Sequence, residues 1–292
     1  MGDFILKFLN RIARGLPRQV LRMIADCPGI LWITEHLAAN RSLEVESPEG
    51  YKLLLNPLFH ASLSARSLYD YEPDLRRAIN KLTKPEMVAY DIGANVGIFT
   101  LLFARIVGPR GVVYAFEPEP NNWQYLKRSV SLNQLDHVLV NTRAIGDCTG
   151  TAVFDRRGGA FSGRLLGTDP KYRRSMNLLN IPTAAIDDLI KREGLKPPDI
   201  VKIDVEGNEL MVLKGMAYTL ATHRPVILCE THTHLGESAQ GVISLLTAFG
   251  YSVFSLHDVA ERPTTAWSPL TELPHAMPIV GIRKAQAFNV PA

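Results

Sequence analysis

An aspartate and two glycines stand together at a position where an α/β protein binds its ligands. Asp91 heads residues 91–97 (DIGANVG), which lie between an apolar run and the helical pattern of residues 98–106. Gly93 and Gly97 allow the backbone to turn sharply and to approach a ligand closely. The alternative is a glycine turn that tightens a strand–helix junction without any ligand. The position and the carboxylate together favour a ligand site.

The carboxylate in this loop limits the chemistry of the ligand. Dinucleotide-binding loops use three glycines to seat a pyrophosphate on a helix N-terminus, and Asp91 would repel that group. S-adenosylmethionine carries an ammonium and a sulfonium and no phosphate, so an acidic loop favours it over NAD or ATP.

A second carboxylate ends the next apolar run. Glu117 has the spacing from the glycine loop at which nucleoside-binding βαβ units place an acid on the ribose hydroxyls. Pro118 would end this strand and begin the next helix. Taken alone, Glu117 could instead be a favourable charge at a helix N-terminus. The pairing with Asp91 favours the ligand role.

Two further carboxylates follow the apolar run of residues 200–203. Asp204 and Glu206 would stand on one face if the strand continued, at the edge of the sheet where a methyl acceptor would meet the sulfonium. The alternative is that one of them caps a helix beginning near Gly207 and Glu209. We expect at least one of the pair in the site.

The next apolar run ends in Glu230 and His232, with His234 close behind. A histidine just past a strand is a candidate general base, since its ordinary pKa lies near neutral pH. A metal site from the two histidines and a carboxylate has unspecific spacing, so we predict no metal. A solvated loop histidine is the other alternative.

The elements that must position these side chains alternate between strands and helices. Strand-like runs occupy residues 87–90, 112–116, 138–140, 200–203, 226–229, 251–256 and 277–282. Helical patterns occupy residues 98–106, 121–133, 186–193 and 209–222. This alternation predicts an α/β fold with a parallel sheet and right-handed crossovers. The last two strands are joined by a proline-rich loop without helical periodicity, which suits an antiparallel pairing.

The alternation also divides the chain. Residues 1–85 read as an N-terminal cap with helical stretches and a hairpin near residues 47–50, and residues 86–285 as the ligand-binding domain. Residues 286–292 form a C-terminal tail. The poorly periodic residues 155–182 predict a long loop or a β insertion over the site.

The composition is that of an ordinary globular protein. Of 292 residues, 46% are hydrophobic and 21% are charged, which excludes an intrinsically disordered chain. The net charge of +3, from 32 basic and 29 acidic residues, is too small for the phosphate-binding surface of a dedicated nucleic-acid binder.

The cysteines and the N-terminus suggest where the protein works. Cys27, Cys148 and Cys229 are too few and too far apart for a disulfide framework or a zinc site, and they predict a cytoplasmic location. Residues 1–9 do not resemble a signal peptide. Residues 4–14 form an amphipathic, basic helical pattern that predicts a helix packed on the domain, with peripheral membrane contact as the alternative.

Seen together, these motifs resemble the FkbM family of S-adenosylmethionine-dependent methyltransferases, a class I, Rossmann-like group. The matching segments are Tyr71 with Glu72 and residues 91–97, 115–118, 144–147, 186–189, 201–207 and 213–215. The resemblance spans residues 68–255. It implies a seven-stranded, mostly parallel sheet of order 3-2-1-4-5-7-6, with the last strand antiparallel and helices on both faces. It also implies methylation of hydroxyls on sugars, glycans, glycolipids or natural products.

The resemblance also assigns roles to residues. The implied cofactor-binding set is Glu72, Asp91, Gly93, Ala94, Asn95, Gly97, Glu117, Pro118, Ala144, Ile145 and Asp204. Within it the glycine loop would surround the methionine moiety, Glu117 the ribose, and Ala144 with Ile145 the adenine edge. On the acceptor side the resemblance implies Asp204 and Glu206 as the acids. Together with Glu230 and His232 from the end of the next apolar run, they make up the predicted catalytic set.

Two alternatives remain open from the sequence. The basic residues 156–174 are the argument for a nucleic-acid or protein methyltransferase, although they fit the choice of a small acceptor equally well. The second alternative is a cofactor-binding protein that has lost its activity. Such a protein should lack acids of the site, and this chain retains Asp91, Glu117, Asp204 and Glu206.

Overall fold

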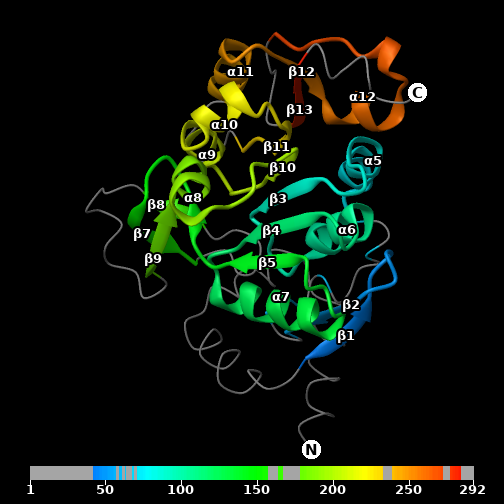
Figure 1. The fold of residues 1–292 in the computed structure, drawn as a ribbon, viewed down its shortest axis with the longest axis vertical. Coiled ribbons are helices and arrows are strands. Elements are labelled where there is room, and N and C mark those ends of the chain that lie inside the picture. Colours follow the sequence, from blue (N-terminus) through cyan, green and yellow to red (C-terminus); the bar gives the residue numbers. More distant parts are fainter. Residues whose placement is uncertain are drawn as a thin grey trace, which may run out of the picture.

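The fold is built on a seven-stranded sheet with helices on both faces (Figure 1). The computed structural model describes residues 42–56, 59–60, 63, 68, 71–156, 164–166, 178–232, 239–271 and 277–283. The strands of the sheet, in chain order, are β3 (Val88–Ile92), β4 (Val112–Phe116), β5 (Val138–Asn141), β10 (Ile200–Ile203), β11 (Val226–Glu230), β12 (Tyr251–Ser255) and β13 (Pro278–Arg283).

The spatial order of these strands is β12-β13-β11-β10-β3-β4-β5. Strand β13 runs antiparallel to both of its neighbours, and the other neighbouring pairs are parallel. The predicted order 3-2-1-4-5-7-6 with an antiparallel last strand is therefore confirmed. In this order β3 and β10 are adjacent, so the glycine loop and the Asp204 segment leave the sheet side by side.

The strands read as continuous apolar runs because both faces of the sheet are covered. On one face, residues such as Ala89 pack with helices α5 (Pro73–Leu82), α6 (Ile98–Val107) and α12 (Leu256–Glu261). On the other face, residues such as Tyr90 pack with α8 (Ile186–Glu193), α9 (Glu209–Lys214), α10 (Ala217–Thr222) and α11 (Ala239–Ala248). Successive residues of β3 therefore point into different halves of the core.

The described part of the N-terminal cap joins a hairpin to this core. Strands β1 (Leu43–Glu46) and β2 (Lys52–Leu55) pair antiparallel around the predicted turn. The backbone N–H of Leu54 donates to Ser129 Oγ at 2.9 Å, which ties the hairpin to α7 (Pro120–Leu132). The amphipathic residues 4–14 and the tail at 286–292 lie outside the described residues.

The segment predicted as a loop or β insertion, residues 155–182, contains β8 (Arg164–Leu166) and most of β9 (Leu178–Ala184). These strands form a second sheet with the preceding β6 (Ala144–Ile145) and β7 (Gly150–Asp155), in the order β6-β9-β7-β8. Figure 1 places this sheet beside α8, away from α5 and α6. Residues 157–163 and 167–177 lie outside the described residues, and the predicted covering of the site stays a prediction.

Two predicted elements differ from the structure. The helix expected at residues 209–222 is divided into α9 and α10 at Gly215, where a Cβ would lie 1.9 Å from the Gly146 carbonyl oxygen. The loop expected between β12 and β13 contains α12 and the 3-10 turn Thr264–Ala266. Helix α12 was not predicted, because its buried residues are only Leu256 and Val259 and two residues do not define a helical periodicity.

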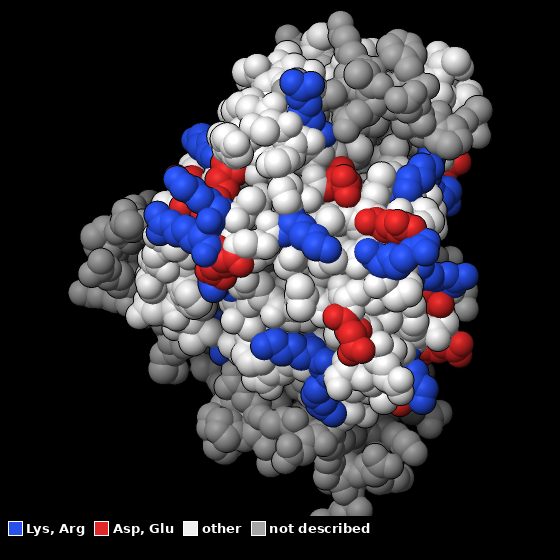
Figure 2. Space-filling view, viewed as in Figure 1, with Lys and Arg blue, Asp and Glu red and all other residues white. Residues whose placement is uncertain are grey.

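The described surface in Figure 2 carries Lys and Arg interspersed with Asp and Glu. This mixture agrees with the small net charge of the chain and differs from the continuous basic field of a phosphate-binding face. Within the described part of the chain, every helix is too short or too polar to cross a bilayer.

Candidate active site

A cavity opens where β3, β10 and β11 end, beside the start of α5. The predicted site residues in its lining are Glu72, Gly93, Ala94, Asn95, Asp204, Glu206, Glu230 and His232. Tyr71, Phe99 and Lys202 complete much of the remaining wall. Residues distant in sequence meet here because the carboxyl ends of neighbouring parallel strands lie at one edge of the sheet.

The remaining predicted residues do not line this cavity. They are Asp91, Gly97, Glu117, Pro118, Ala144 and Ile145. Ala144 and Ile145 belong to β6 and are buried in two separate core clusters. Contact of these two residues with the adenine stays a prediction.

Asp91 corrects one expectation from the sequence. Its side chain was expected to point into the cleft, but β3 continues through Ile92, so Asp91 is a strand residue and is fully buried beneath α6. Asp91 Oδ2 accepts a hydrogen bond from the Thr100 hydroxyl at 2.6 Å. Its Oδ1 has no hydrogen-bond partner among the described residues, and Lys202 Nζ lies 3.4 Å away as an ion pair. Asp91 therefore contacts Thr100 and Lys202 and does not line the cavity.

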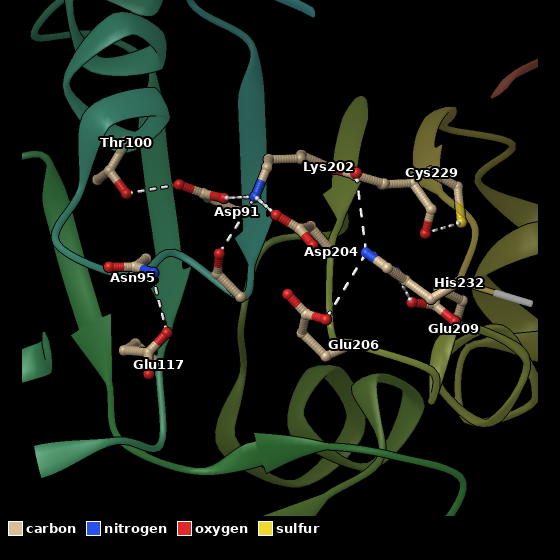
Figure 3. Close-up of polar contacts among 12 residues, drawn as sticks. Asp91, Asn95, Thr100, Glu117, Lys202, Asp204, Glu206, Glu209, Cys229 and His232 are labelled. Atoms are coloured by element: carbon tan, nitrogen blue, oxygen red, sulfur yellow. Dashed lines mark hydrogen bonds and ion pairs between the residues drawn. The ribbon is translucent and has the colours of Figure 1, made fainter. Parts of the chain in front are cut away.

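Lys202 is the principal site residue that the sequence analysis missed. Its ammonium donates to the Gly93 carbonyl at 3.1 Å and lies 3.4 Å from both Asp91 Oδ1 and Asp204 Oδ2 (Figure 3). It also lies 5.5 Å from the centroid of the Phe99 ring. Burial alone would lower the pKa of Lys202, but the charges of Asp91 and Asp204 outweigh it and raise the pKa. A signal existed, since a lysine inside an apolar strand requires buried acidic partners.

The backbone of the glycine loop lies in close contact with the segment that follows β10. Gly93 has φ +78°, and a Cβ there would lie 1.8 Å from the carbonyl oxygen of Asp204. Gly97 has φ +98°, and a Cβ there would lie 2.4 Å from Leu126 Cδ1. Both positions need glycine for its left-handed backbone and for the close contact. The predicted sharp turn is confirmed, and the close approach of this loop to a ligand stays a prediction.

Glu117 holds the same loop from the side of β4. Its carboxylate accepts hydrogen bonds from the backbone N–H groups of Asn95 at 2.8 Å and Glu119 at 2.9 Å, and from the Asn122 amide at 3.2 Å. Burial raises the pKa of Glu117 to about 7, against the lowering effect of these donors. Glu117 thus stands at the predicted strand end and fixes the loop, while its contact with a ribose stays a prediction.

A histidine among carboxylates forms the other side of the cavity. His232 Nε2 lies 3.8 Å from Glu206 Oε2 and 3.7 Å from Glu230 Oε1 (Figure 3). Burial lowers the pKa of His232, but the hydrogen bond with Glu209 and the charge of Glu206 outweigh it and raise the pKa to about 9. Burial and the charge of Asp204 raise the pKa of Glu230 to about 8.

This group also has the composition of a metal site. One ligand atom each from Asp204, Glu230 and His232 lie within 4.8 Å of one another. Against a cation, the Lys202 ammonium lies 3.4 Å from Asp204 Oδ2 and would repel it. The expected lack of a metal stays a prediction.

The charge of the cavity suits the cationic groups of S-adenosylmethionine. Its wall contains four carboxylates, from Glu72, Asp204, Glu206 and Glu230, against the side chains of Lys202 and His232. Burial, and to a smaller extent the charge of Asp204, raises the pKa of Glu72. An ammonium and a sulfonium would relieve this excess, whereas a pyrophosphate would increase it.

Comparison with known proteins agrees with this chemistry. Residues 91–253, more than half of the chain, match the model of the methyltransferase FkbM domain. The hexuronic acid methyltransferase AglP of Haloferax volcanii is 28% identical over 177 residues, which cover 60% of this chain and 68% of AglP. The 31-O-demethyl-FK506 methyltransferase FkbM of Streptomyces tacrolimicus is 27% identical over 216 residues, covering 62% and 82%.

A third relative is the 2-O-methyltransferase NoeI of Sinorhizobium fredii. It is 25% identical over 189 residues, which cover 60% of this chain and 76% of NoeI. The segment matched by the family model begins at Asp91 and includes the glycine loop, Glu117, the acids after β10 and Glu230 at the end of β11. The chain belongs to the FkbM family of methyltransferases and is an S-adenosylmethionine-dependent enzyme.

Proposed function

We propose that this enzyme methylates a hydroxyl group of a sugar, glycan or natural-product acceptor. The observation that supports it is the meeting of Asp204, Glu206, Glu230 and His232 in one cavity beside the glycine loop. Proton-accepting groups next to a cationic cofactor suit the deprotonation of a hydroxyl as it becomes an ether. The names of the relatives, which include a hexuronic acid methyltransferase and a 2-O-methyltransferase, agree with such acceptors.

The chain's own residues would share the work as follows. When bound, S-adenosylmethionine would supply a methyl group attached to a positively charged sulfur. That sulfur is the leaving group and needs no protonation. Asp204 or His232 accepts the proton of the hydroxyl as its oxygen gains the methyl group. Lys202 holds Asp204 and the Gly93 carbonyl in fixed positions. Positioning of the two reactants makes the larger contribution to the rate.

We also propose how the cofactor is held. Glu72 and the loop from Gly93 to Gly97 face the methionine end, and Glu117 accepts hydrogen bonds from the ribose. Asp91 supports the methionine end indirectly, through Lys202. Pro118, Ala144 and Ile145 retain their predicted places beside the nucleoside.

The alternative of a nucleic-acid or protein acceptor loses part of its support. It depended on the basic residues 156–174, of which residues 157–163 and 167–174 lie outside the described residues. Arg156 is engaged with the carboxylate of Glu119, with Nη2 to Oε1 at 2.7 Å, and its side chain is only 11% exposed. The cytoplasmic location and the membrane contact of residues 4–14 stay predictions.

The acceptor class is tested by transfer of labelled methyl groups. The protein is incubated with methyl-labelled S-adenosylmethionine and separate panels of glycans, macrolides, transfer RNA and protein. We expect alkali-stable label, as an ether resists alkaline hydrolysis, in a glycan or macrolide hydroxyl. Label in RNA or protein alone would overturn the proposal. His232→Gln serves as the control, because it shows how much label is transferred when an acceptor-side group is missing.

The cofactor assignment is tested by calorimetry. We expect S-adenosylhomocysteine to bind and NAD not to bind, because the cavity has an excess of carboxylates. Glu117→Ala should weaken S-adenosylhomocysteine by about 1–3 kcal/mol, the cost of lost hydrogen bonds to a charged acceptor. Glu44→Ala, which changes an exposed carboxylate on β1, should bind like the wild type. Micromolar binding of NAD without heat from S-adenosylhomocysteine would contradict the assignment.

A further inference from the structure

Glu209 is a buried carboxylate that contacts two loops of the site. It lies in the first turn of α9 and is 2% exposed. Its Oε1 accepts a hydrogen bond from the backbone N–H of Gly207 at 2.9 Å. The same oxygen lies 2.8 Å from His232 Nδ1 (Figure 3). Glu209 therefore connects the loop after β10 with the segment after β11.

This contact favours one tautomer of the neutral His232 ring. An ionised carboxylate only accepts hydrogen bonds, so Nδ1 must be the donor towards Glu209. In the neutral ring the lone pair is then on Nε2. That nitrogen lies on the side of Glu206 and Glu230, which line the cavity with His232.

The backbone around Glu209 supports the same arrangement. Glu206 has φ +56° and Gly207 has φ +102°, so the chain turns sharply between β10 and α9. The hydrogen bond from the Gly207 N–H to Glu209 closes this turn. One carboxylate thus fixes the turn that carries Glu206 and the ring of His232 that faces it.

We propose that Glu209 is the positioning residue of His232, holding the proton on Nδ1 so that Nε2 accepts the proton of the acceptor hydroxyl. The inference rests on the proposed methylation of a hydroxyl. Removal of the hydroxyl proton turns His232 into an imidazolium, and the Glu209 carboxylate stabilises that charge. The acceptor oxygen gains the methyl group and gives its proton to Nε2, so the step is balanced.

The charged groups around His232 come from three elements. Asp204 and Glu206 follow β10, Glu209 belongs to α9, and Glu230 ends β11. All four attract a proton to the ring, and Lys202 opposes them from beside Asp204. Among these acids Glu209 forms the shortest contact with the ring, so its removal has the largest expected effect on the ring nitrogens.

The test is nuclear magnetic resonance of protein labelled with nitrogen-15 in its histidines. The signals of His232 are identified by their loss in His232→Gln. At a pH above about 9, where the ring is neutral, we expect the tautomer with the proton on Nδ1. In Glu209→Gln the pKa of His232 should fall, because the carboxylate that stabilised the imidazolium is replaced by a neutral amide of the same shape. Glu193→Gln, which changes an exposed carboxylate at the end of α8, should leave the pKa of His232 unchanged.

Two outcomes would overturn the inference: a neutral His232 with its proton on Nε2 in the wild type, or an unchanged His232 pKa in Glu209→Gln. If Glu209→Gln does not fold, the tautomer of His232 in the wild-type protein is sufficient to test the inference. Neither measurement uses an acceptor, so failure here is distinguishable from failure of the proposed function.

Kinetics give a further readout once the acceptor is known. Glu209→Gln should lower kcat by about 10²-fold, since the imidazolium that forms when His232 takes the proton loses the carboxylate that stabilises it. The rising limb of its pH profile should move to lower pH, with affinity for S-adenosylhomocysteine retained. A merely structural role would leave the position of that limb unchanged.

Discussion

Lys202→Met is expected to lower the free energy of unfolding by about 3–5 kcal/mol, the usual cost of removing one partner from a buried ion pair. Methionine fits the aliphatic stem but leaves Asp91, which is fully buried, without its cation. The carbonyl of Gly93 loses its donor as well. Urea unfolding followed by circular dichroism measures the change.

Two further variants separate this cause from a general packing defect. Lys52→Met, which changes an exposed lysine paired with Glu44, should alter stability by no more than about 0.5 kcal/mol. Asp91→Asn combined with Lys202→Met should be more stable than the sum of the two single changes predicts, since the uncompensated charge is then gone. Strict additivity, or a Lys202→Met protein as stable as the wild type, would refute the electrostatic explanation.

Asp204→Asn is expected to lower turnover by about 10²- to 10⁴-fold, the usual contribution of a positioned acid or base. Its carboxylate lies in the cavity next to the loop that Gly93 forms. Because the change removes charge but little volume, affinity for S-adenosylhomocysteine should fall far less than turnover. Methyl transfer to a hydroxylated acceptor and calorimetry measure the two quantities.

Glu206→Gln is the matched change on the same loop. The alternative from the sequence was that this pair of acids caps the following helix, but the N-cap residue of α9 is Asn208. If both variants keep wild-type turnover, or if both merely unfold, the catalytic assignment of the pair is wrong.

The sheet was predictable from the sequence because its strands are buried on both faces. Each strand then appears as a short apolar run, and the ends of β4 and β10 agree with the predicted residues 112–116 and 200–203. The acids that end such runs were predictable for the same reason, since parallel strands bring their carboxyl ends to one edge.

The contacts between side chains were less predictable. Lys202 was overlooked because three apolar residues surround it in β10, and its acidic partners lie on other segments. Asp91 was placed in the cleft because the end of β3 was expected two residues too early. The partnership of Glu209 with His232 depends on how α9 packs beside β11, which no local pattern encodes.

The shared ammonium of Lys202 has a consequence for how the two ligands change each other's affinity. It contacts the proposed cofactor loop through Gly93 and the proposed acceptor side through Asp204. A ligand that neutralises the charge of Asp204 changes the electrostatic potential at Lys202. It therefore also changes the affinity of the neighbouring glycine loop for the cofactor. Thermodynamic reciprocity then requires that the cofactor alter the dissociation constant of the acceptor by the same factor by which the acceptor alters that of the cofactor.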